Sequence, residues 1–170
     1  MKVILAPAVT LDGFLADANG ECYTWINPAD EARYNKRRSE IGCELVGRKT
    51  YEQYKDSYDM QSNVTIYVYT SKTSYADTPR VKFISGDIHT ALSHIKNDGF
   101  TTVLVSGGGE LNGVLASAGV INEIFLSYHP LTLGKGIPLF GSYNPQLSLE
   151  LLSTNQDVPG VVQHHYRVVR

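Results

Sequence analysis

The residues best suited to hold a phosphorylated ligand are three consecutive glycines, Gly107, Gly108 and Gly109. A β-branched run precedes them and apolar residues at helical spacing follow them, which predicts a strand, a glycine turn and a helix. The free N–H groups at the start of such a helix, with the positive end of its dipole, attract phosphate, and glycine lets a ligand approach the backbone. This stretch therefore indicates a nucleotide or another phosphorylated ligand. A tight strand-to-helix connection without a ligand is the alternative.

Two other predicted strands end in residues that also suit phosphate. One strand ends at Gly47, and Arg48 and Thr50 then open a helix. Arginine offers a planar fork of N–H donors, and threonine offers a neutral hydroxyl donor. Another strand ends at Thr70 and passes directly into Ser71. An exposed arginine and a capping threonine are the structural alternative at the first of these strand ends.

Two aspartates could contact a substrate or move a proton. Asn27 and Pro28 mark the start of a helix that carries Asp30 in its first turn, where a negative charge is favourable. Close to Trp25, the same carboxylate could anchor a substrate or supply a proton in a partly apolar pocket. Asp12 lies in a turn just beyond the first strand, where open α/β sheets bind ligands. A helix start and a tight turn would equally explain the two residues.

The remaining chemistry-bearing residues do not form a recognised catalytic pattern. His89 and His94 are five residues apart and off one helical face, and His164 and His165 point to opposite faces of a predicted strand, so no metal site is expected. Ser106 lacks the G-x-S-x-G pattern of a nucleophile elbow. The glycine run also lacks the Lys-Ser/Thr ending of a P-loop, and it comes too late in the chain for the first unit of a Rossmann domain.

The elements that must position these residues alternate between strand and helix over most of the chain. This order predicts an α/β fold with a mostly parallel central sheet flanked by helices. No helical pattern separates the last strands, so the sheet is expected to end in an antiparallel C-terminal hairpin. The strands are expected at residues 2–9, 43–47, 64–70, 81–84, 101–105, 122–130, 147–152 and 161–169, and the first helix at residues 28–41.

Composition limits the class of protein and its partners. The chain has 170 residues, which suits a single domain over residues 1–170. Its net charge is −2 and its pI is about 6.2, so no nucleic acid or anionic membrane is expected as a partner. No apolar run approaches the ~20 residues of a membrane span, and no signal peptide is evident. Cys22 and Cys43 are expected to be free thiols of a cytoplasmic protein.

Four stretches spread over nearly the whole chain carry a family resemblance: TLDGFLA, VGRKTYE, LVSGGGELNGVLASAGVINEIFLSYHP and LGKGIPLF. In this order they resemble the dihydrofolate-reductase-like superfamily, and within it the reductase domain of bifunctional riboflavin-biosynthesis proteins. The resemblance implies a three-layer dihydrofolate-reductase-like fold and NADPH as the cofactor. No deaminase domain with zinc ligands precedes these stretches, so the chain is not expected to be the complete bifunctional enzyme. A homodimer, formed through residues 124–133 and the C-terminal strands, is a further expectation from those relatives.

The resemblance also assigns residues. Arg48 would lie near the adenosine 2′-phosphate of NADPH and Thr50 near its pyrophosphate. Asp12 matches an aspartate beside the substrate pocket of the riboflavin-type branch, whereas the segment WINPAD resembles the acid-bearing segment of true dihydrofolate reductases, which nominates Asp30. Trp25 would also face the substrate. The cofactor residues so implied are Gly47, Arg48, Thr50, Thr70, Ser71, Gly107, Gly108, Gly109, Glu110 and Leu111.

The function expected from these observations is an NADPH-dependent reductase that transfers a hydride to a small heterocyclic substrate. It would be similar to the 5-amino-6-(5-phosphoribosylamino)uracil reductase of riboflavin biosynthesis, with Asp30 as the first candidate for the proton donor. A dihydrofolate or pterin reductase is one alternative. A non-catalytic nucleotide-binding protein on the same fold is another, and a phosphosugar-binding enzyme that uses only the glycine turn is a third.

Overall fold

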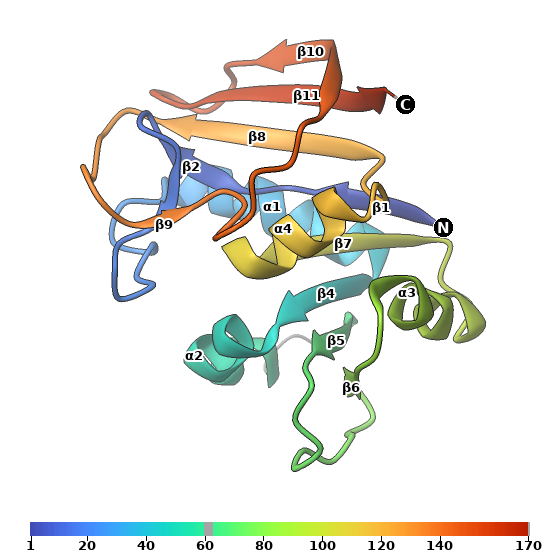
Figure 1. Ribbon diagram of the computed structural model, residues 1–170. Coiled ribbons are helices and arrows are strands. Elements are labelled where there is room, and N and C mark those ends of the chain that lie inside the picture. Colours follow the sequence, from blue (N-terminus) through green and yellow to red (C-terminus); the bar gives the residue numbers. More distant parts are fainter. Residues whose placement is uncertain (60–62, 170) are drawn as a thin grey trace.

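The computed structural model describes residues 1–59 and 63–169 of the chain. Strands and helices alternate through most of it, as Figure 1 shows. The elements in chain order are β1 (Lys2–Leu5), β2 (Ala8–Thr10), β3 (Phe14–Ala16), α1 (Pro28–Ile41), β4 (Cys43–Gly47), α2 (Arg48–Asp59), β5 (Thr65–Tyr69), β6 (Val81–Ile84), α3 (Ile88–Asn97), β7 (Thr102–Gly107), α4 (Gly109–Ser117), β8 (Glu123–His129), β9 (Ile137–Pro138), β10 (Ser148–Asn155) and β11 (Val162–Val169).

One large sheet forms the centre of the molecule, with the strand order β10-β11-β8-β1-β7-β4-β5-β6 and with β2 beside β8. Every pair from β8 to β6 is parallel. Strand β11 runs antiparallel to β8, and β10 runs antiparallel to β11. The expectation of a mostly parallel sheet with an antiparallel C-terminal hairpin is confirmed.

The first strand differs from the expectation. A single strand was expected over residues 2–9, but the chain breaks it at Pro7 into β1 and β2. Proline has no N–H to donate to a neighbouring strand, and here its carbonyl accepts the N–H of Ser127 at 3.0 Å. Strand β1 therefore pairs with both β7 and β8, whereas β2 pairs with β8.

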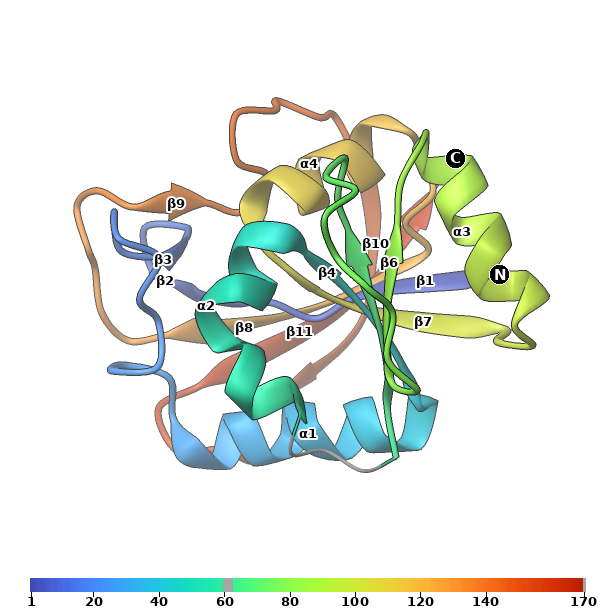
Figure 2. The ribbon, with the colours of Figure 1, turned by 90° about the horizontal axis from the view of Figure 1, so that it is seen from below.

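Helices cover both faces of the sheet, so the molecule has three layers with the sheet in the middle (Figure 2). Helices α3 and α4 bury apolar side chains, including Leu92, Ile95 and Leu115, in the main core against β1, β4, β7 and β8. On the opposite face a smaller apolar cluster, which includes Val46 and Val68, lies beside α2. Among the described residues, no helix combines the length and apolar character that a membrane crossing requires.

Helix α1 covers the same face as α2, but it contacts the sheet through charged side chains. Its start is fixed as the sequence predicts, because the side chain of Asn27 accepts the N–H of Ala29 at 2.9 Å. Its end is fixed by Gly42, whose φ of 71° is left-handed. The buried residues of this helix are Asp30 and Arg38. Buried charges need partners, so α1 places a polar network between itself and the sheet.

Candidate active site

The three strand ends singled out in the sequence lie on one edge of the sheet. Strands β7, β4 and β5 are parallel neighbours, so their C-terminal ends at Gly107, Gly47 and Tyr69 share that edge. Two of the turns are in direct contact, because the hydroxyl oxygen of Thr50 accepts the N–H of Gly108 at 3.1 Å. The first turn of α2 is thus in direct contact with the start of α4.

The glycine turn between β7 and α4 depends on glycine for its conformation and for its packing. Gly107 has a φ of 90°, and the peptide bond between Gly107 and Gly108 is cis. Gly108 is the N-cap of α4 and supplies no side-chain hydrogen bond. A Cβ on Gly109 would lie 2.6 Å from the carbonyl oxygen of Pro138 and 2.8 Å from the nitrogen of Gly141. The start of α4 is therefore open on one side and tightly packed on the other.

Two residues of this helix start do not present their side chains to the edge. The carboxylate of Glu110 accepts hydrogen bonds from the N–H and the hydroxyl of Ser142, at 2.9 and 2.8 Å. Leu111 is buried in the main core. Of these two residues, only the backbone N–H groups remain as donors toward a ligand at the helix start.

A cavity of about 270 Å³ opens beside the end of β5. The residues that line it are Arg48, Tyr69, Thr70, Ser71 and Gly86. The structure thus brings together three of the predicted residues, Arg48, Thr70 and Ser71, which offer a guanidinium and two hydroxyl groups. Below we refer to this cavity as the small cavity.

A larger cavity of about 690 Å³ lies between α1, the sheet and the start of α2. Thr50, Gly107, Gly108 and Asp30 are among the residues that line it. Arg48 lines the small cavity, and the next residues of α2 line the large one, so the two cavities flank the first turn of α2.

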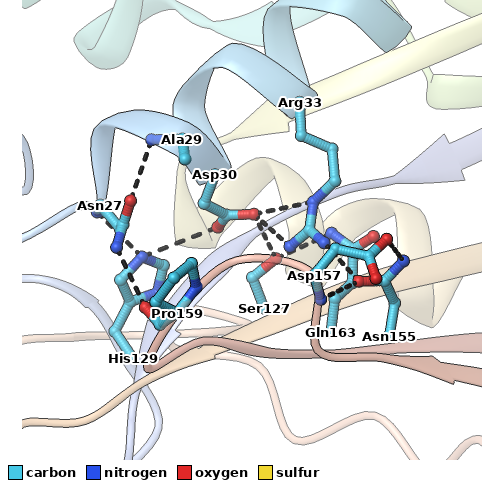
Figure 3. Close-up of polar contacts among 10 residues, drawn as sticks. All are labelled: Asn27, Ala29, Asp30, Arg33, Ser127, His129, Asn155, Asp157, Pro159 and Gln163. Carbon is cyan, nitrogen blue, oxygen red and sulfur yellow. Dashed lines mark hydrogen bonds and ion pairs between the residues drawn. The ribbon is translucent and has the colours of Figure 1, made fainter.

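Asp30 lines the large cavity and belongs to a polar network (Figure 3), and only 5% of its surface is exposed. Its Oδ1 accepts N–H groups of Arg33 at 2.5 and 3.1 Å and the hydroxyl of Ser127 at 3.2 Å. Its Oδ2 lies 3.7 Å from Nε2 of His129, beyond hydrogen-bonding distance. The carboxylate is thus anchored through Oδ1, and within the described part of the chain its second oxygen accepts no hydrogen bond.

The C-terminal hairpin supports this network from behind (Figure 3). Arg33 also donates to the side-chain oxygen of Asn155 at 3.1 Å. Gln163 donates to the hydroxyl of Ser127 at 2.8 Å, and it lines the large cavity itself. Strands from the edge of the sheet therefore help to fix the position of Asp30.

His129 and Trp25 form the next part of the same region. The Nε2 atom of His129 accepts the N–H of Asn27 at 3.1 Å, which ties β8 to the start of α1. Burial lowers the pKa of His129 below its ordinary value, although the carboxylate of Asp30 acts in the opposite direction. The ring of Trp25 packs edge-on against His129, with 5.2 Å between ring centroids. Trp25 thus contacts this histidine and is not among the residues that line the large cavity.

Asp12 is placed outside the large cavity. Its carboxylate accepts the hydroxyl of Thr10 at 2.6 Å and the N–H groups of Leu133 and Gly134. The hydrogen bond from Thr10, together with those from the two backbone groups, lowers the pKa of this exposed carboxyl. Asp12 fixes a turn against the segment after β8, and of the two nominated aspartates only Asp30 lines the cavity.

The sequence reasoning missed a buried charged cluster on the wall of the large cavity. Glu44 on β4 accepts the hydroxyl of Tyr34 at 2.9 Å and an N–H of Arg38. All three residues line the cavity, and Glu44 and Arg38 are buried. One feature of the sequence could have indicated this cluster. Glu44 lies in a short predicted strand whose other residues are apolar or small, and a charged residue buried in a parallel sheet needs a partner.

Two further residues beside the glycine turn were also missed. The hydroxyl oxygen of Ser106 and the side-chain oxygen of Asn112 are buried and have no hydrogen-bond partner among the described residues. Both residues line the large cavity. Buried polar groups are normally paired, so these two atoms are suited to contact a polar ligand.

The thiol and phenol groups near the cavity mouth are neutral at physiological pH. Burial raises the pKa of Cys22 to about 11 and that of Tyr23 to about 12. Cys22 is a free cysteine in contact with the hydroxyl of Tyr54 at 3.8 Å. These residues line the cavity with neutral hydrogen-bonding groups and add no charge to it.

Known proteins resemble this chain over nearly its whole length. The Bacillus subtilis (strain 168) protein YyaP is 28% identical over an alignment of 178 residues, which covers 97% of this chain and 94% of that protein. A deaminase/5-amino-6-(5-phosphoribosylamino)uracil reductase from Thermotoga maritima superposes with a TM-score of 0.82 at 18% identity, over 99% of this chain and 56% of that one. A dihydrofolate reductase from Enterococcus faecalis superposes with a TM-score of 0.74 at 16% identity, over 99% and 97%.

The two solved structures establish the dihydrofolate-reductase-like fold, at identities too low to transfer an activity. The family assignment comes from sequence, because the model of the RibD C-terminal domain matches residues 1–163. This match agrees with the resemblance carried by the four sequence stretches. The chain belongs to the RibD C-terminal domain family.

Proposed function

We propose that the protein is an NADPH-dependent reductase that transfers a hydride to a small heterocyclic substrate. The observation that carries this proposal is the pair of cavities on either side of the first turn of α2. An elongated ligand that crosses this turn would meet Arg48 at one end and Asp30 at the other. The family assignment and the reductase structures on the same fold support the same proposal.

The residues along the edge fit a dinucleotide. Gly108 caps α4 without a side chain, so the backbone N–H groups of the helix start can approach a pyrophosphate. Arg48 carries the positive charge that a 2′-phosphate requires, and Thr70 and Ser71 add hydroxyl groups beside it. The side-chain oxygen of Asn112, which has no hydrogen-bond partner among the described residues, suits a hydrogen-bond donor of the ligand beside the glycine turn.

The large cavity is the proposed site of reduction. NADPH, when bound, supplies the hydride. Asp30 is the proposed substrate-contacting carboxyl group, through which the proton reaches the reduced heteroatom. Arg33 and Ser127 hold its Oδ1 in place, so Oδ2 meets the substrate in a fixed orientation. The apolar segment at residues 5–8 and Ile137 would cover the flat faces of a heterocycle and exclude water from it.

The cofactor assignment is tested by titrating NADPH and NADH against the wild type and Arg48→Ala. We expect the substitution to weaken NADPH binding by about tenfold or more, equivalent to ~1.4 kcal/mol, because a charge-assisted contact to phosphate is lost. NADH binding should change little. Arg167→Ala is a matched control, since that arginine also pairs with a glutamate but lies in the C-terminal hairpin. The assignment is wrong if the wild type binds no NADPH, or if both proteins bind NADPH and NADH equally.

A second candidate function is a non-catalytic nucleotide-binding protein. It is favoured by the hydrogen bonds that the nominated carboxylates already make, since Asp12 is paired with Thr10 and two backbone groups and Asp30 with Arg33 and Ser127. This candidate requires cofactor binding without oxidation of NADPH by any heterocycle. A panel that includes dihydrofolate and 5-amino-6-(5-phosphoribosylamino)uracil separates the two functions.

We further propose that the protein forms a homodimer through β10, the edge strand of the large sheet. Leu149 and Leu151 are 44% and 54% exposed and lie two residues apart on this strand. An unpaired edge with exposed leucines favours association with a second copy. Ile124 and Leu126 from the other expected segment are buried in the core of this chain, so the C-terminal strands are the proposed face.

A further inference from the structure

Glu52 lies next to Arg48 at the small cavity. It is four residues further along α2, and its Oε2 accepts an N–H of Arg48 at 2.5 Å. The hydroxyl of Tyr75 donates to Oε1 of the same carboxylate. Both oxygens of Glu52 are therefore engaged, one by the guanidinium that lines the small cavity and one by a residue of the segment between β5 and β6.

Tyr75 is itself held in place. Its ring stacks on that of Phe83 in β6, with 4.6 Å between centroids and 7° between planes. The segment that carries Tyr75 begins with Thr70 and Ser71, two residues that line the small cavity. Glu52 thus connects α2 to the segment that borders this cavity, and its carboxylate has a defined position.

The carboxylate of Glu52 is a fixed negative charge. The hydrogen bond from Tyr75, assisted by the positive charge of Arg48, lowers the pKa of Glu52, so the group is ionised at neutral pH. The other residues that line the small cavity carry no charge. The positive charge that Arg48 offers to a ligand is therefore partly balanced by a negative charge one helical turn away, and Lys72, next to Ser71, is a second cation close enough to interact with Glu52.

This balance affects two kinds of ligand differently. A phosphate monoester carries nearly two negative charges and is repelled by a nearby carboxylate, whereas a ribose hydroxyl is neutral and can donate to one. Arginine has five N–H donors, and the ion pair with Glu52 leaves others for a ligand. Arg48 can consequently contact a phosphate while Glu52 reduces the net attraction.

We propose that Glu52 is a specificity-determining residue. Arg48 favours a phosphate monoester over a hydroxyl group in the small cavity, and Glu52 weakens this preference. In this protein that means a reduced discrimination between NADPH and NADH. The inference rests on the proposed function for the identity of the ligand. It states that Glu52 lowers the ratio of the affinity for NADPH to the affinity for NADH.

The test compares Kd values for NADPH and NADH in the wild type and in Glu52→Gln, measured by calorimetric titration at one fixed ionic strength. Glutamine keeps the size of the side chain. Its single oxygen can still accept from Arg48, and its amide NH2 can donate to the hydroxyl oxygen of Tyr75, so the substitution removes the charge and keeps both contacts, with the hydrogen bond to Tyr75 reversed in direction. We expect the affinity ratio of NADPH to NADH to rise about tenfold, as a like charge near the phosphate is lost. The same change is expected between adenosine 2′,5′-bisphosphate and adenosine 5′-monophosphate, which differ only in the 2′-phosphate.

Tyr75→Phe is the matched control. It removes the hydrogen bond to Glu52 and keeps both the stacked ring and the Arg48–Glu52 ion pair. We expect its affinity ratio to stay within about twofold of the wild type, because the charge of Glu52 remains. A purely structural role of Glu52 would change the absolute affinities in both variants and leave the ratio unchanged.

The outcomes separate this inference from the proposed function. An unchanged or lower ratio in Glu52→Gln, or an equal rise in Tyr75→Phe, overturns the role of Glu52 and leaves the reductase proposal standing if NADPH still binds. Absence of binding of either dinucleotide to the wild type and to both variants overturns the proposed function, and the specificity role with it.

Discussion

Asp12 and Asp30 show how two residues of one type acquire different roles. Asp12 is exposed and fixes a turn through Thr10 and the backbone of Gly134. Asp30 is buried, paired with Arg33 and in contact with the large cavity. The resemblance to the two branches of the superfamily nominates different carboxylates. Since only Asp30 lines the large cavity, we propose Asp30 as the carboxylate that contacts the substrate.

Replacement of Asp30 by asparagine tests this choice. Asp30→Asn keeps the shape of the side chain but removes the group that we propose to handle the proton. We therefore expect turnover with a reducible heterocycle to fall on the order of 10²-fold, the usual contribution of a positioned acid or base. NADPH affinity should be unchanged, because Asp30 lines the large cavity whereas Arg48 lines the small one. Steady-state kinetics and cofactor titration measure the two quantities.

Asp12→Asn is the control for this prediction. Its turnover per folded molecule should match the wild type, while its thermal stability falls because the turn loses charge-assisted hydrogen bonds. The reverse result, with Asp12→Asn inactive and Asp30→Asn active, would assign the chemistry to the riboflavin-type aspartate and contradict our proposal.

Packing constrains the sequence of helix α4 at two of its glycines. Gly109 and Gly113 are four residues apart and therefore lie on one face of the helix. That face contacts the segment before β10, where Pro138, Phe140 and Gly141 approach the helix backbone. The glycine-rich character of this stretch thus has two causes, since Gly107 and Gly108 shape the turn at the cavity and the two helical glycines allow close packing.

The packing explanation is tested with Gly113→Ala. An added Cβ would lie 2.5 Å from the carbonyl oxygen of Phe140 and would also collide with Tyr143. We expect the free energy of unfolding to fall by about 1–3 kcal/mol, as for other overpacked interiors, despite the higher helix propensity of alanine. Urea denaturation measures the change. Ser117→Ala, at an exposed position of the same helix, should leave stability within about 0.5 kcal/mol. A Gly113→Ala protein as stable as the wild type would show that the neighbouring segment yields freely.

At the scale of the whole molecule, the C-terminal hairpin joins the proposed active site to the proposed dimer face. Strand β11 supplies Gln163 to the network below Asp30, and β10 forms the outer edge of the sheet. Asn155, at the end of β10, contacts Arg33. Residues of the proposed interface and residues that support Asp30 thus lie on the same two strands.

The dimer is tested with Leu151→Lys. A charged side chain on the exposed face of the edge strand should oppose association, since burial of an unpaired charge is costly. We expect light scattering after size exclusion to give a dimer for the wild type and a monomer for the variant. Leu11→Lys serves as a control, because Leu11 is 70% exposed but lies in the turn after β2 and not on the edge strand β10. A monomeric wild type would contradict the proposed assembly.

The secondary structure could be predicted because its signals are local. The N-cap at Asn27 and the glycine turn at Gly107 each depend on residues within a few positions of one another. The order of strands and helices then favours a parallel sheet, and in such a sheet the ends of neighbouring strands share one edge. The break at Pro7 also has a local signal that was missed, because a proline within a predicted strand has no N–H to donate to a neighbouring strand.

The sequence by itself determined most of the elements, the chain's fold class and the phosphate-compatible residue types at three strand ends, since each of these depends on short-range spacing. Only the tertiary structure decided which carboxylate reaches the large cavity, which residue holds the second oxygen of Glu52, and where Glu44 and Arg38 meet. The physical reason is that burial and pairing arise between distant parts of the chain, as between Asp30 and Ser127, which are separated by 97 positions. Residue type alone does not specify such partners.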